Sequence, residues 1–107
     1  MNSSEGEMIY LYYTIAWRRL VGGWEVYAYQ DRKTDFGVAR LCGKDLQKTI
    51  ELIKESVSLR GASDTSDSII RRKVEEKRSQ LMAKVREEVD AYADSLWGVD
   101  KEGNEDA

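Results

Sequence analysis

The feature that most constrains this fold is a long helical pattern, from about Asp67 to Trp97, with neither proline nor glycine inside it. Its main apolar residues recur every eleven positions, a period of about 3.67 residues per turn that keeps one stripe along one side of a helix. About 30 residues at 1.5 Å each extend about 45 Å, whereas a domain of this size is only about 30 Å across. The helix therefore either breaks or has part of its stripe covered by another chain.

Charge is segregated along the same helix. Residues 71–86 hold seven basic and two acidic side chains, and residues 87–107 hold eight acidic side chains and one basic side chain. Because a helix dipole favours acidic residues first and basic residues last, this order suits an antiparallel second copy better than the helix itself. Arg78 would then approach Glu88, and Leu81 would lie near the twofold axis. We therefore predict a homodimer that self-associates through the apolar stripe and one charge pair: Ile70, Val74, Leu81, Val85, Val89, Tyr92, Leu96, Arg72 and Asp94.

The first part of the chain favours β-strands, because it is rich in Ile, Val, Tyr, Thr and Trp. One strand-like run extends from Ile9 to Val21 and a second from Trp24 to Gln30, with Gly22-Gly23 between them. A glycine pair in this position predicts a two-residue hairpin turn, since such turns need positive φ angles. Residues 31–35 predict a second turn, and Phe36 to Cys42 a third short strand. The result is a three-stranded antiparallel meander.

The apolar spacing then changes to a helical one. Leu46, Ile50, Ile53 and Val57 are four, three and four residues apart, which places them on one face of an α-helix. The predicted fold class is thus α+β, with three antiparallel strands followed by two helices (β-β-β-α-α), the second of them long.

The chain is short enough to form one domain. We expect residues 8–97 to form that domain, with the long helix over 67–97 at its end. Residues 1–7 are expected to be a disordered leader, and residues 98–107 an acidic, frayed tail.

Alternation along the predicted hairpin separates two sets of side chains. With Gly22-Gly23 at the turn, Arg18 is expected to lie opposite Tyr27. One set of side chains is expected to form a core that a helix covers: Ile9, Leu11, Tyr13, Ile15, Trp17, Val26 and Ala28. The other set has three interpretations: a purely structural face, a protein-binding face, or a platform that stacks the bases of single-stranded nucleic acid. Its predicted partner-binding residues are Tyr10, Tyr12, Arg18, Tyr27 and Tyr29.

Composition excludes several chemistries. The chain has no histidine and one cysteine, Cys42, which rules out His-based catalytic triads, His-containing zinc sites and an internal disulfide. It also lacks a Gly-rich phosphate loop and a D-x-D-x-D-G calcium loop, so we expect no enzyme activity, no cofactor and no metal. The polar, acidic start and the absence of a long apolar run predict a protein outside the membrane, in the reducing cytoplasm.

These features predict a small non-catalytic protein-interaction module that binds a protein partner. Compact, charge-rich chains of this kind are common among phage and mobile-element regulators and inhibitors, and we expect such a role here. The alternative is a nucleic-acid-binding protein that uses the sheet face and the basic start of the long helix. Its possible phosphate contacts are Arg71, Arg72, Lys73, Lys77 and Arg78. The net charge of −3 gives no overall attraction to nucleic acid.

Overall fold

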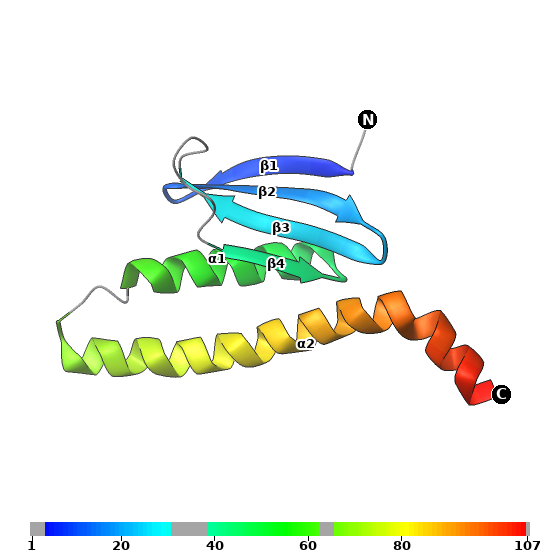
Figure 1. The fold of residues 1–107 in the computed structure, drawn as a ribbon. Helices are drawn as coiled ribbons and strands as arrows, with labels where there is room; N and C mark the ends of the chain where they lie inside the picture. The colour runs from blue at the N-terminus through cyan, green and yellow to red at the C-terminus, as the bar shows by residue number, and fades with distance from the viewer. Residues whose placement is uncertain (1–3, 31–38, 63–65, 107) are drawn as a thin grey trace.

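The fold is a four-stranded antiparallel sheet followed by two helices, an α+β arrangement (Figure 1). The computed structural model describes residues 4–30, 39–62 and 66–106, with side chains over 4–30, 39–60 and 66–97. The strands lie in the order β1-β2-β3-β4. The elements are β1 (Glu5–Tyr10), β2 (Tyr13–Leu20), β3 (Gly23–Tyr29), β4 (Ala39–Gly43), α1 (Leu46–Ala62) and α2 (Ser68–Asp106).

The prediction of three strands was wrong, because the first strand-like run reverses direction in its middle. The chain turns at Leu11 and Tyr12, and Leu11 takes a positive φ of 56°. Leucine rarely adopts this conformation, so the sequence carries no turn signal there. The added strand, β1, begins at Glu5, inside the segment predicted to be a disordered leader. The predicted turn at 31–35 and the start of the strand predicted from Phe36 lie outside the described residues.

This early turn exchanges the two faces of β1. Tyr10 pairs with Tyr13 and Ile9 pairs with Thr14, so Tyr10 shares the face of Tyr13 and Ile15. Ile9 was predicted to lie in the core, but it is on the other face and highly exposed. The reason is the period-two alternation of a strand, in which a shift of one residue moves every side chain to the opposite face.

The β2–β3 hairpin turns one residue earlier than predicted. Leu20 pairs with Gly23, so the turn residues are Val21 and Gly22, and Gly22 has a φ of 84°. Arg18 therefore pairs with Glu25 instead of Tyr27. The partner of every β2 residue moves by two positions, which leaves each side chain on its predicted face.

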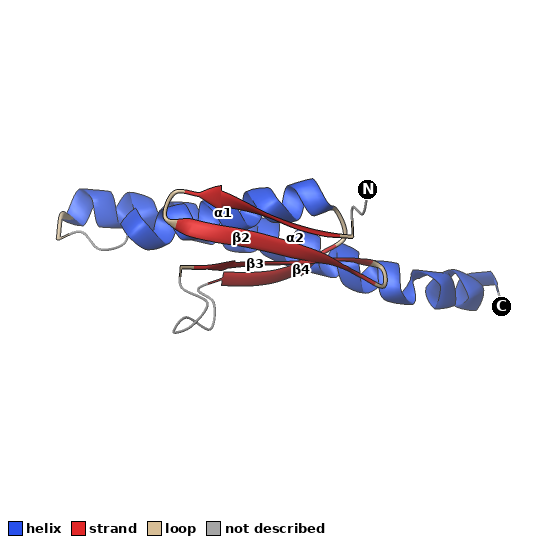
Figure 2. Ribbon diagram, turned by 90° about the horizontal axis from the view of Figure 1, so that it is seen from above, coloured by secondary structure: helices blue, strands red, loops and turns tan. Residues whose placement is uncertain are grey.

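Helix α1 lies against one face of the sheet (Figures 1 and 2), and the core lies between the two. Asp45 is the N-cap of α1, because its Oδ1 accepts the Lys48 N–H at 2.9 Å. The predicted apolar face of α1 is confirmed, and the buried residues of the sheet and helices form one cluster: Ile15, Val26, Ala28, Leu41, Ile50, Leu52, Ile53, Val57 and Leu81. Among the described elements, no helix covers the opposite face of the sheet (Figure 2).

The long helix α2 is unbroken and lies beside α1 and β4 (Figure 1). Its N-cap is Asp67, whose Oδ1 accepts the N–H groups of Ile69 at 2.9 Å and Ile70 at 3.2 Å. It continues as helix through Gly98 to Asp106, beyond the end predicted at Trp97. The molecule measures 57 × 34 × 21 Å, and α2 provides its long dimension.

Candidate protein-binding surfaces

The open face of the sheet is organised around one buried carboxylate. Glu25 is only 4% exposed. Its Oε1 accepts the Nε–H of Arg18 at 2.7 Å, and its Oε2 forms an ion pair with Arg40. The two arginine side chains are 59% and 70% exposed, so Glu25 holds two guanidinium groups in fixed positions at the surface. We call Arg18, Glu25 and Arg40 the arginine triad.

Two tyrosines continue this face along β3. The rings of Tyr27 and Tyr29 are stacked, with centroids 5.9 Å apart and planes inclined by 26°. Tyr27 lies opposite Arg40 on one side and Ala16 on the other, while Tyr29 lies opposite Thr14. Tyr29 is buried and Tyr27 is half-buried. The open face therefore combines a charged region at Glu25 with an aromatic region beside it.

The structure brings together three of the five predicted partner-binding residues, namely Arg18, Tyr27 and Tyr29. Tyr12 is highly exposed but lies in the β1–β2 turn. Tyr10 was assigned to the open face, and this was wrong. The early turn puts Tyr10 on the helix side, where its hydroxyl lies 3.2 Å from the Ser58 hydroxyl.

Sequence reasoning missed Arg40 and the role of Glu25. Cross-strand pairing of Arg18 with Glu25 follows once the turn is placed at Val21 and Gly22. The position of Arg40 depends on the register in which β4 pairs with β3, and the residues that precede β4 do not determine that register. The sequence therefore contained enough information to pair Glu25 with Arg18, but not enough to place Arg40 beside them.

The fold buries part of the predicted self-association stripe on α2 and leaves the rest exposed. Val74 and Leu81 are buried in the chain's own core, so they do not form an available surface. Val85 and Tyr92 are half-buried, whereas Ile70, Val89 and Leu96 remain exposed. Arg72 and Asp94, the predicted charge pair, are both exposed.

Glu88 attaches the middle of α2 to the start of α1. It is 8% exposed, and its Oε2 accepts the N–H groups of Lys44 and Asp45, each at 2.8 Å. Since this carboxylate already binds two N–H groups within the chain, the predicted approach of Arg78 to Glu88 of a second copy would compete with these hydrogen bonds. Farther along α2, the Ser95 hydroxyl donates to the Gly22 carbonyl at 2.8 Å.

The possible phosphate contacts do not share one surface. Successive residues of a helix are rotated by about 100°, so five cations between Arg71 and Arg78 point in several directions. Lys77 lines a groove together with Lys84, whereas Arg78 lines a different one beside Met82. Arg72 is exposed and lines neither of these two grooves.

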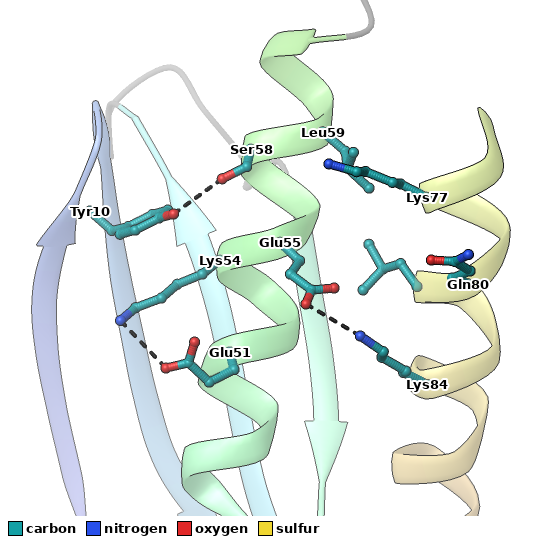
Figure 3. A pocket seen from close by; sticks show the side chains of 10 residues that line it. Tyr10, Glu51, Lys54, Glu55, Ser58, Leu59, Lys77, Gln80 and Lys84 are labelled. Atoms are coloured by element: carbon teal, nitrogen blue, oxygen red, sulfur yellow. Dashed lines mark hydrogen bonds and ion pairs between the residues drawn. The ribbon is translucent and has the colours of Figure 1, made fainter. Parts of the chain in front are cut away.

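The groove that contains Lys77 lies over α1, between Tyr10 and α2, and has a volume of about 460 Å³ (Figure 3). Lys54 lies 3.7 Å from Glu51 and 5.3 Å from the centre of the Tyr10 ring. Lys84 reaches Glu55 at 3.5 Å. The charged groups that line this groove thus largely pair with one another, and they link α1 to β1 and to α2.

Comparison with protein-family models, curated proteins and solved structures finds no match to this chain. Within the described residues, neither helix has an apolar span long enough to cross a membrane. The same residues contain no cluster of His, Cys, Asp and Glu side chains placed to hold a metal ion. The function has to be inferred from the surfaces described above.

Proposed function

We propose that this chain is a small non-catalytic protein-interaction module that binds its partner through the open face of the sheet. The observation that carries this proposal is the arginine triad, in which a buried carboxylate holds two exposed arginines beside stacked tyrosines. Arginine and tyrosine are enriched among the residues that dominate binding energy. Because these arginines are already ordered, binding loses less side-chain entropy.

The triad favours a partner that presents a carboxylate. A guanidinium carries five N–H donors, and Arg18 and Arg40 each direct one nitrogen to Glu25. Two positive charges share one negative charge, which leaves donors and a net positive charge at the surface. An Asp or Glu side chain of the partner would bind these donors through charge-assisted hydrogen bonds.

This proposal includes a regulatory or inhibitory role, of the kind common among phages and mobile elements, exerted by binding. It also places the protein in the cytoplasm, where a reducing environment keeps the single thiol of Cys42 free of disulfides.

Nucleic-acid binding has less support. The cations at the start of α2 lie on different sides of the helix, so one phosphate backbone does not reach all of them. On the sheet, Glu5 and Glu7 share the open face with Arg18, because Glu5 pairs with Arg18 and Glu7 with Ala16. Their carboxylates would repel phosphate.

A capture experiment from the native host, with and without nuclease, tests the proposal. The variant replaces the whole triad, Arg18→Gln, Glu25→Gln and Arg40→Gln, so that no buried charge is left without a partner. The control Lys73→Gln removes the same net charge elsewhere. We expect a nuclease-resistant protein partner that the control retains and the triad variant binds at least about tenfold more weakly, a difference of about 1.4 kcal/mol.

Nuclease-sensitive capture would favour the nucleic-acid alternative. Equal binding by a folded triad variant, shown by an unchanged circular dichroism spectrum, would move the binding surface away from the sheet.

A further inference from the structure

One flank of α2 carries a line of apolar side chains that the rest of the chain covers only in part. Met82, Val89 and Leu96 are 58%, 37% and 39% exposed. They are seven residues apart, so they lie nearly in line along the helix. The half-buried Val85 and Tyr92 fall between them. We call these five residues the α2 seam.

The spacing of the α2 seam is that of a coiled coil. Its members follow one another at intervals of three, four, three and four residues, the pattern with which one helix accepts another. Single exposed apolar residues are normal on a protein surface, but a continuous line with this period indicates a helical partner. The seam differs from the stripe predicted from sequence, because Val74 and Leu81 are used in the core.

Charge identifies the partner helix. Seven of the nine charged residues in 71–86 are basic, and eight of the nine in 87–107 are acidic. The boundary between these halves lies within three residues of Val89, the midpoint of the seam. A parallel second copy would place like charges together, whereas an antiparallel copy places each basic half beside an acidic half.

We propose that two copies of this chain pair antiparallel along the α2 seam. The contact is symmetric about a twofold axis near Val89, as closed dimers require. The Met82 end of one copy then lies beside the Leu96 end of the other. The α2 seam shares no residue with the arginine triad, so the dimer is a proposal separate from the function proposed above.

Sedimentation at micromolar concentration tests the dimer. The unmodified chain is expected to sediment as a dimer. Val89→Glu should raise the dimer dissociation constant more than about tenfold, because it places two carboxylates together at the twofold axis. Met82→Glu is a second variant at a more exposed site. The control is Val21→Glu, a highly exposed apolar residue in the β2–β3 turn, which should leave the dimer intact.

The antiparallel orientation of the two α2 helices is tested by introducing opposite charges at the two ends of the seam. Met82→Lys and Leu96→Glu should each weaken the dimer, and the two together should restore most of the loss, because opposite charges meet only in the antiparallel arrangement. A monomeric unmodified chain, or a folded Val89→Glu variant that still dimerises, would overturn the proposal. Failure of the double variant to recover would overturn the antiparallel arrangement.

Discussion

Glu88→Ala should be among the most destabilising single substitutions in this chain, although the residue looks like one of many acidic side chains in the sequence. The substitution removes the acceptor of the Lys44 and Asp45 N–H groups, both at 2.8 Å, at a site that is only 8% exposed. Hydrogen bonds to a charged group contribute roughly 1.5–3 kcal/mol each. Since water can enter the space and bind part of the exposed backbone, we expect a loss of about 3–5 kcal/mol. That is a large share of the roughly 5–15 kcal/mol that stabilises a small domain.

Urea denaturation followed by far-ultraviolet circular dichroism measures this loss. Glu88→Gln keeps one acceptor oxygen without the charge and should lose about half as much. Glu87→Ala is the matched control, because Glu87 is the exposed neighbour on the same helix and should change stability by no more than about 0.5 kcal/mol. If Glu88→Ala were as stable as Glu87→Ala, the two hydrogen bonds would not be what fixes α2 to the start of α1.

Two further predictions concern the turns and use thermal melting. Gly22→Val should lower stability by at least about 1–2 kcal/mol, because Gly22 has a φ of 84° and a Cβ there would lie 2.9 Å from Leu96 Cδ2; an unchanged midpoint would show that the turn lies elsewhere. Leu11→Gly should be neutral or stabilising by up to about 1 kcal/mol, because it relieves a leucine held at a φ of 56°. A clear loss on Leu11→Gly would instead show that the leucine side chain contributes to packing.

The elements with a strong local period could be predicted from sequence. Ile50, Ile53 and Val57 have the spacing of one helix face, and all three are buried where α1 meets the sheet. The β2–β3 hairpin was found because glycine marks its turn. The β1–β2 turn was missed because Leu11 and Tyr12 have no turn preference and lie inside a continuous run of strand-forming residues.

The candidate surfaces were less predictable, because burial of a charged side chain depends on the tertiary fold. Glu88 lies seven residues after Leu81, on the same face of α2, so its position on the core side could have been read from the helix period. That its carboxylate meets the backbone before α1 could not be read in the same way, since it depends on how α1 and α2 are placed. In the same way, the ion pair of Arg40 with Glu25 could not be read from the sequence, because it depends on how β4 pairs with β3.

The attachment of α2 has a geometric consequence. Its contacts with the rest of the chain include Val74, Leu81, Glu88 and Ser95, which follow one another at intervals of seven residues. In a straight α-helix such a line drifts around the axis by about 20° per interval, so over three intervals the line of attachment turns by roughly 60°. The α2 seam beside it, from Met82 to Leu96, spans two such intervals and turns by about 40° in the same direction. A helix that follows this seam would therefore cross α2 at an angle of about 20°, winding around it instead of lying parallel to it.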